Sequence, residues 1–314
     1  NYAIMLENGE GVEVNYEEAI KYYKMAIDKG IPEAMNNYAV MLHQGKGVEV
    51  NYEEAIKYYK MAIDKGYPSA MYNYAAMLEH GDGVEVNYEE SLKYYKMASD
   101  KGLPIAMNKC AIMYHHGKGV EVNYKEAIKY YKMAINEGNV DAMFNFANML
   151  QHGEGVEINY NIASKLFKNA GDRGHPVAMN NYAMMLKNGK GIEVNYKEAI
   201  KYFKMAINHG YSLAIYNYAT MLEDGEGVEV NYEEAIKYYK MAIDKGVPYA
   251  MNNYAVMLKQ GKGVEVNYEE ALKYYKMSAD EGYPVAMHNY ANMLLNCEGI
   301  EVDYKEVAKY LKMA

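Results

Sequence analysis

Histidine is the residue whose spacing in this chain first suggests metal chemistry. His80, His116 and His152 lie 36 residues apart, each directly before a glycine. Imidazole nitrogens are common zinc ligands, with a Zn–N bond of about 2 Å. Packed helices approach each other only to about 8–10 Å, so equivalent positions on successive helices are too far apart to share one ion. We interpret the three histidines as polar residues near helix ends, and we expect no metal site and no cofactor.

Carboxylates, hydroxyls and glycines also lack the arrangement of a catalytic site. Glu53 and Glu54 recur as a pair, but they stand where a helix start and a solvated face are expected. The repeated Gly45-x-Gly47 is a helix stop, and a lone Gly-x-Gly is weak support for a phosphate site. The single threonine and the six serines have no nucleophile-elbow setting. We therefore expect the chain not to be an enzyme.

The eight residues from Gly45 to Tyr52 organise the whole chain. Their pattern occurs nine times at a fixed period of 36 residues, from Gly9 onward, and in the ninth copy Cys297 replaces the first glycine. A fixed period of this length indicates a repeat array. We expect residues 1–314 to form one array as a single domain, with truncated first and last repeats.

The first half of each repeat has the pattern of an amphipathic helix. Pro32 suits the first helical turn, where its missing N–H costs nothing. Gly45 suits the left-handed residue that ends a helix. The sequence predicts a helix over 32–44, which we name helix A. Apolar residues recur there at i, i+3, i+4 and i+7, as helical packing requires: Ala34, Met35, Tyr38, Met41 and Leu42.

The second half carries its own start and stop signals. Asn51 is an N-cap, and Glu54 completes a capping box that Ile162 breaks in one repeat. Gly66 ends the helix, which is predicted over 52–65 and which we name helix B. Each helix has one apolar face, so a lone repeat cannot be stable and stacked repeats must supply the core.

This unit resembles the Sel1-like repeat, a relative of the tetratricopeptide repeat. Asn51 departs from the family's capping aspartate, which returns at Asp303. The resemblance implies an all-α, right-handed superhelical solenoid, with helix A on the concave side, that acts as a scaffold or adaptor for other proteins. The matching residues of the second repeat are Ala34, Gly45, Gly47, Val48, Ala55, Tyr58, Tyr59, Ala62 and Gly66.

The composition limits which classes of partner and which compartment we expect. The net charge of −9, with lysines and glutamates interspersed, argues against nucleic acid and against an anionic membrane surface. No apolar run approaches the ~18 residues of a membrane span. Two cysteines at unmatched repeat positions favour a reducing compartment, so we expect a cytoplasmic protein with a protein or peptide partner. Neither end has a capping repeat, so we also expect end-to-end self-stacking.

Two variable positions of helix A are the candidate partner-binding site. Both are expected opposite the apolar stripe, and the alternation at the first suggests duplication of a two-repeat unit. The first position holds aromatic residues or histidine in alternate repeats, as possible anchors, and asparagine between them. The residues concerned are Tyr72, Phe144, Tyr216 and His288, then Asn36, Asn108, Asn180 and Asn252, and at the second position Val40, Ala76, Ile112 and Asn148.

A second row of asparagines has two interpretations. Asn37 recurs through the array and is replaced only by Lys109. The row either grips the backbone of a partner or bonds neighbouring repeats.

Alternatives to a scaffold are a structural spacer with no ligand, or a β-lactam hydrolase like the cysteine-rich branch of the family, whose cysteines are missing here. We also expect weak points at Cys297 and in the fifth repeat, at Ile162 and Gly171.

Overall fold

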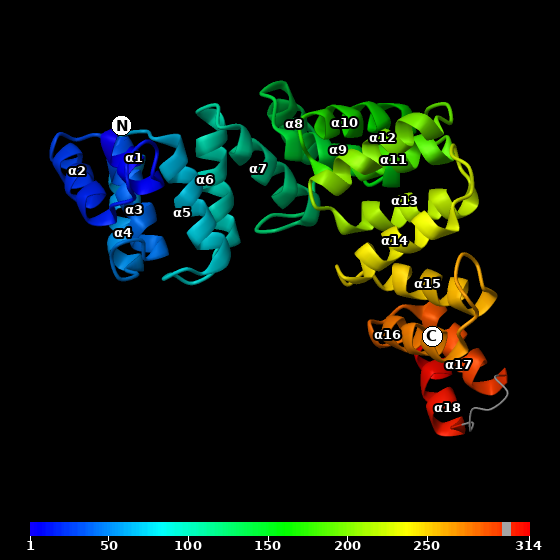
Figure 1. Ribbon diagram of the computed structural model, residues 1–314. Helices are drawn as coiled ribbons and strands as arrows, with labels where there is room; N and C mark the ends of the chain where they lie inside the picture. The colour runs from blue at the N-terminus through cyan, green and yellow to red at the C-terminus, as the bar shows by residue number, and fades with distance from the viewer. Residues whose placement is uncertain (297–302) are drawn as a thin grey trace. The chain divides into compact units, whose positions relative to one another are not determined.

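The computed structural model describes residues 1–296 and 303–314, which are helical with short connecting turns (Figure 1). This described part holds eighteen helices and no strand, so the predicted all-α repeat fold is confirmed. In chain order the helices are α1 (Tyr2–Asn8), α2 (Tyr16–Asp28), α3 (Pro32–Gln44), α4 (Tyr52–Asp64), α5 (Pro68–His80), α6 (Tyr88–Asp100), α7 (Pro104–His116), α8 (Tyr124–Asn136), α9 (Val140–His152), α10 (Tyr160–Asp172), α11 (Pro176–Asn188), α12 (Tyr196–Asn208), α13 (Ser212–Asp224), α14 (Tyr232–Ile243), α15 (Pro248–Gln260), α16 (Tyr268–Asp280), α17 (Pro284–Asn296) and α18 (Tyr304–Met313).

Local signals set these boundaries. Helix A of the second repeat, α3, has its proline in the first turn, and Gly45 follows at φ 71°. An L side chain at such a φ costs roughly 1–2 kcal/mol, because Cβ crowds the carbonyl oxygen. Helix B, α4, begins after Asn51, whose side chain accepts from the N–H of Glu54 at 3.0 Å.

The capping box is formed differently from the prediction. The backbone N–H of Asn51 donates to the carbonyl oxygen of Leu42 at 2.9 Å, so the carboxylate of Glu54 does not receive that bond. The same connection joins the two helices in most of the other described repeats, for example from the N–H of Asn195 to the carbonyl oxygen of Leu186 at 3.0 Å. The N-cap therefore closes the helix hairpin as well as starting helix B.

The fifth repeat keeps its cap in spite of the predicted weakness. The N–H of Ile162 still donates to the Asn159 side chain at 3.0 Å, because this half of the cap needs no side chain at position 162. Gly171 is buried inside α10, and a Cβ there would lie 3.2 Å from Cγ of Met179. Its small size is thus matched to a close neighbour. Cys297, the other predicted weak point, lies outside the described residues.

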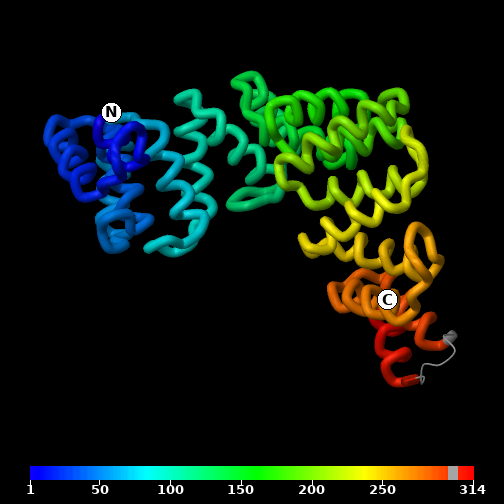
Figure 2. Tube along the Cα trace, viewed as in Figure 1, coloured from blue at the N-terminus to red at the C-terminus, as the bar shows by residue number. Residues whose placement is uncertain are grey.

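The chain divides into two compact units, residues 1–158 and 159–314. Within the first unit, helices α1 to α9 alternate A and B types along the trace (Figure 2). In this unit α3 and α4 pack against each other, and α3 also touches α5 of the next repeat. In the second unit the same pattern runs from α10 to α18 in the described part.

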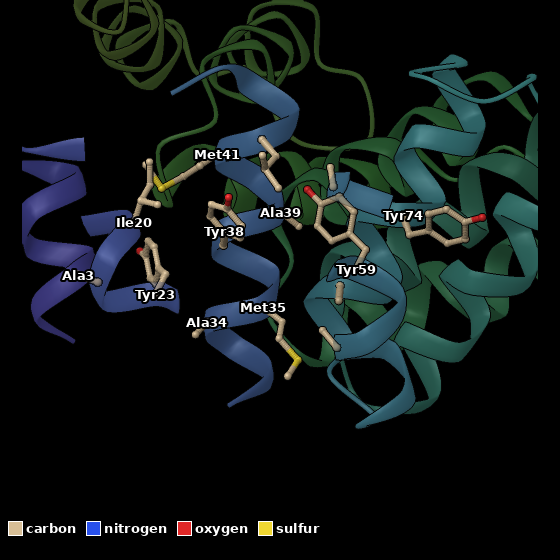
Figure 3. Close-up of a cluster of buried hydrophobic side chains, with 14 of the residues drawn as sticks. Ala3, Ile20, Tyr23, Ala34, Met35, Tyr38, Ala39, Met41, Tyr59 and Tyr74 are labelled. Carbon is tan, nitrogen blue, oxygen red and sulfur yellow. The ribbon is translucent and has the colours of Figure 1, made fainter. Parts of the chain in front are cut away.

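Alanine and tyrosine build the interior of a repeat. Ala55, Tyr59 and Ala62 of α4 have no exposed surface. Figure 3 shows Tyr38 of α3 and Tyr59 of α4 within one buried cluster. The alanines allow close helix approach, and the rings fill the remaining volume, since protein interiors pack to crystal-like density.

Glycine also sets the distance between neighbouring repeats. A Cβ on Gly47 would lie 2.3 Å from Cβ of Tyr16, in the preceding repeat, and Gly83 has the same relation to Tyr52 at 2.1 Å. The second glycine of the motif is therefore required both by its positive φ and by this close approach. None of the described helices is long and apolar enough to cross a membrane.

Candidate functional site

The predicted anchor side chains lie at the boundary between core and solvent. Tyr72 of α5, Phe144 of α9 and Tyr216 of α13 are half-buried, whereas His288 of α17 is exposed. The Tyr72 ring centroid lies 5.4 Å from that of Tyr95, a buried residue of α6 in the same repeat. The anchor ring is thus held by a fixed ring beneath it, and burial raises the pKa of its hydroxyl, with a further contribution from Glu79.

Tyr216 has more aromatic neighbours than Tyr72. Its ring centroid is 6.1 Å from that of buried Tyr239 and 5.7 Å from that of Tyr249, at the start of α15. Tyr249 in turn meets Tyr283 edge-on, at 4.8 Å between centroids. Tyr216 lies in one repeat, and Tyr249 and Tyr283 lie near the two ends of the next. We name these three residues the tyrosine row.

The second variable position is also half-buried. Val40, Ala76, Ile112 and Asn148 all have intermediate exposure. They follow the anchor position by four residues, so in each repeat they lie on the same face of helix A, one turn further on. We use the name helix-A face for the half-buried or exposed residues at these two positions.

The four asparagines of the first position are not part of this face, and the sequence-based placement is wrong for them. Asn36, Asn108, Asn180 and Asn252 are only 5%, 5%, 6% and 4% exposed. The helical period places their position opposite the apolar stripe, but an amide there meets the next repeat rather than solvent. Buried amides need hydrogen-bond partners, and each of these has one across the repeat interface.

That partner is the second row of asparagines. Asn73 donates to Asn36 at 2.9 Å, and Asn36 itself donates to Asn37 at 3.1 Å. Equivalent inter-repeat bonds join Asn145 to Asn108, Asn217 to Asn180 and Asn289 to Asn252, at 3.2, 2.8 and 2.9 Å. Of the two interpretations of the Asn37 row, the structure supports bonding between neighbouring repeats.

Lys109, the one residue that breaks this row, belongs to a partly buried polar group that sequence reasoning missed. Its ammonium lies 3.1 Å from Oε2 of Glu79, and the Tyr95 hydroxyl donates to the same oxygen at 2.9 Å. Burial alone would raise the pKa of Glu79, but the bonds and charge of Lys109, with Tyr95, lower it. The pair could have been suspected from the sequence, because α5 carries an acid and the next repeat has a lysine in place of the usual asparagine.

Charge alternates along the turns that follow helix A. Odd-numbered repeats carry acids at the positions of His43 and Lys46, and even-numbered repeats carry bases there. The exceptions in sequence are Gln151 and Leu295, both at the position of His43. Acidic and basic side chains therefore meet between neighbouring repeats: Glu7 with Lys46 (3.7 Å), His43 with Asp82 (3.2 Å), Glu79 with Lys118 (3.9 Å), His115 with Glu154 (2.7 Å), Lys187 with Glu226 (2.7 Å) and Glu223 with Lys262 (3.6 Å).

The predicted histidine row has ordinary local contacts. Nδ1 of His80 lies 2.8 Å from the carbonyl oxygen of Ala76, and His116 stacks on His115 at 4.5 Å. Among the described residues, no group of three metal-ligating side chains is close enough to hold an ion. Burial raises the pKa of the Cys110 thiol to about 12, so the thiolate needed for nucleophilic chemistry is disfavoured.

The family model of the Sel1 repeat matches nine times in succession, over residues 1–31, 32–67, 68–103, 104–139, 140–175, 176–211, 212–247, 248–283 and 284–314. A comparison with curated protein sequences gives no match.

Two solved structures are similar over most of this chain. One is c5321, a protective antigen of uropathogenic Escherichia coli with an SLR fold; it is 28% identical, with a TM-score of 0.84, over 99% of this chain and 67% of its own. The other is a Sel1 repeat protein of Oxalobacter formigenes, 27% identical with a TM-score of 0.72, over 77% of this chain and 96% of its own.

Proposed function

The chain belongs to the Sel1 repeat family, and we propose that it is a non-enzymatic scaffold that binds a segment of a partner protein on the helix-A face. Proteins of this family are commonly scaffolds for protein interactions. We further propose that the nine repeats work as one array, and that the protein acts in the reducing cytoplasm, as the free thiol of Cys110 suggests.

The observation that carries this proposal is the contrast between the two sides of helix A. The interior positions barely vary from repeat to repeat, as with Ala39 and Met41, which have no exposed surface. The helix-A face varies in every repeat and presents half-buried aromatic rings such as Tyr72 and Tyr216. Rings held from beneath bring large contact area at a low entropy cost, which is why aromatic residues are enriched among the residues that dominate protein binding.

The test is to remove the rings from the full chain. Peptides selected from a phage-displayed library serve as the probe, and the variant carries Tyr72→Ala, Phe144→Ala and Tyr216→Ala. We expect the selected peptides to lose most of their affinity while the melting temperature falls by less than the core change Tyr38→Ala causes. The control removes Met25 and Met241, which are 49% and 38% exposed on helix B, and should leave binding unchanged.

Peptides that bind the triple variant as well as the parent chain would contradict the proposal. So would a control variant that loses binding equally, because the ligand would then lie on the helix-B side.

A further inference from the structure

The two units contain the same polar constellation with one difference. In the first unit it consists of Tyr72, Glu79 and Tyr95, and in the second of Tyr216, Glu223 and Tyr239, each 144 residues (four repeats of 36) further on. The buried tyrosine donates to the acid in both, at 2.9 Å to Glu79 and 2.7 Å to Glu223.

In the first unit the chain itself supplies a cation to this constellation. The Lys109 ammonium lies 3.1 Å from Oε2 of Glu79 and 5.9 Å from the centroid of the Tyr95 ring. Lys118 adds a second, more distant charge at 3.9 Å from Glu79. The acid therefore has two cations near it, and each of them also faces a tyrosine ring, an attractive arrangement.

In the second unit the place of Lys109 is taken by Asn253, a neutral amide. Asn253 donates to the Tyr239 hydroxyl at 3.2 Å. Among the described residues, the cation near Glu223 is Lys262, at 3.6 Å. Tyr216 and Glu223 are close enough to influence each other, since the pKa of Tyr216 is raised first by burial and further by the charges of Tyr283 and Glu223. The second constellation thus retains its rings and its acid but lacks one positive charge.

The second unit also extends the aromatic surface outward. Tyr249 is 39% exposed, and it bridges Tyr216 and the half-buried Tyr283 within the tyrosine row. In the first unit the residue equivalent to Tyr249 is Ile105, also 39% exposed, so no comparable row exists there. Ring faces carry partial negative charge, which favours a cation above them.

We propose that the tyrosine row, with Glu223 beside it, receives an arginine or lysine side chain of the partner segment. This inference depends on the proposed function and specifies the chemistry of its partner. The partner's cation takes the part that Lys109 plays in the first unit: it lies against tyrosine rings and in the field of a carboxylate. An extended segment carrying one basic residue among polar or apolar ones fits this surface, whereas an acidic segment is repelled by Glu223.

The experiment uses the full chain with ring-labelled tyrosine, followed by NMR. The probes are an extended glycine–serine peptide with one central arginine, and the same peptide with glutamine instead. We expect the arginine peptide to shift the signals of Tyr216, Tyr249 and Tyr283, assigned through single Tyr→Phe variants, and to bind roughly tenfold more tightly than the glutamine peptide, as a cation over partly desolvated rings implies.

Two variants exchange the cation between the units. Asn253→Lys copies the arrangement of Lys109 and should reduce arginine binding to the glutamine level with little change in melting temperature. Lys109→Asn should do the reverse and add arginine-dependent shifts at Tyr72. Tyr249→Ser should weaken arginine binding, while Ile105→Ser, at the equivalent position and with equal initial exposure, should not.

Equal affinity for the two peptides, or an undiminished arginine preference in Asn253→Lys, would overturn the inference. If library-selected peptides still depend on the helix-A rings in that case, the scaffold proposal stands and only the cation preference fails. If those peptides do not depend on the rings, the proposed function fails as well.

Discussion

Gly83 lies directly against Tyr52 of the preceding repeat, so that a Cβ on the glycine would stand 2.1 Å from Cβ of the tyrosine. Real atoms do not approach so closely, and Gly83 also has a φ of +69°. The motif glycine therefore fixes the spacing between repeats, in addition to the conformation of its own turn.

Replacing Gly83 by alanine should destabilise the array more than replacing Gly102. Gly102 has a φ of +83°, but no atom lies within 4 Å of a Cβ placed there. Gly102→Ala should cost only the strain of a left-handed residue, roughly 1–2 kcal/mol. Gly83→Ala adds a clash that two repeats must move apart to relieve, for a total of about 3 kcal/mol or more. Urea unfolding followed by circular dichroism measures both. Equal losses would mean that the turn alone explains the glycine.

These two glycines also show what the sequence can and cannot predict. Helix bounds follow from local signals: Pro32, Gly45 and Asn51 each act within one turn, so helices A and B are placed almost to the residue. The close approach that requires glycine at position 83 involves Tyr52 of the preceding repeat. A periodic sequence does not give the distance between repeats, so this requirement could not be predicted.

Only part of the candidate site could be predicted, again because the sequence pattern does not give the contacts between repeats. Periodicity placed Tyr72 and Val40 on a variable face of helix A. It could not separate Asn36 from that face, because Asn36 occupies the same repeat position as Tyr72 and the neighbouring repeat decides its burial. The Lys109–Glu79 pair also joins residues of different repeats, and only three-dimensional packing brings them together.

The Asn36–Asn73 bond should show measurable coupling between adjacent repeats. Asn36 is 5% exposed, and its Oδ1 accepts from Asn73 at 2.9 Å. Asn73→Ala leaves a buried acceptor without its partner, at a cost of about 1–3 kcal/mol. Asn36→Ala together with Asn73→Ala should cost less than the sum of the two single changes, by at least ~0.5 kcal/mol. Strict additivity in this double-mutant cycle would show that the bond does not contribute to stability.

Lys109 should stabilise the protein in a pH-dependent manner through Glu79. The pKa of Glu79 is lowered in the folded state, so its contribution is present above the ordinary carboxyl pKa and is lost as the pH falls through the lowered value. Lys109→Met should cost about 1–3 kcal/mol near pH 7, because a charge-assisted bond is lost. The difference in stability between this variant and the parent chain should shrink as the pH is lowered from 5 to 3.

A second lysine-to-methionine variant, at Lys96, separates the loss of the Lys109–Glu79 bond from the loss of side-chain packing. Lys96 also lies over a tyrosine, 4.9 Å from the centroid of the Tyr114 ring, but no carboxylate bond to it is seen in the described residues. Lys96→Met should give a stability difference that does not vary with pH over the same interval. If the two variants share one pH profile, the Lys109–Glu79 pair is not its source.

The alternating charges predict that this array tolerates the loss of two repeats better than the loss of one. Stability of a repeat array normally falls with each repeat removed, since it is a sum of repeat and interface terms. Deleting residues 104–139 would place Glu79 opposite Glu154, two acids at one interface. Deleting residues 104–175 would place Glu79 opposite Lys190 and restore an opposite pair.

The Glu79 side chain is only 9% exposed, and both deletions remove its nearest cation, Lys109. The charge placed opposite Glu79 therefore decides the outcome, because an uncompensated buried charge costs roughly 3–5 kcal/mol. That loss exceeds what a few exposed ion pairs return, at about 0–1 kcal/mol each. We therefore expect the longer deletion to melt at a higher temperature than the shorter one, as measured by circular dichroism. Adding Glu154→Lys to the shorter deletion should recover most of the difference. A shorter deletion that is already the more stable of the two would show that array length, and not the alternation of acidic and basic repeats, governs how these units stack.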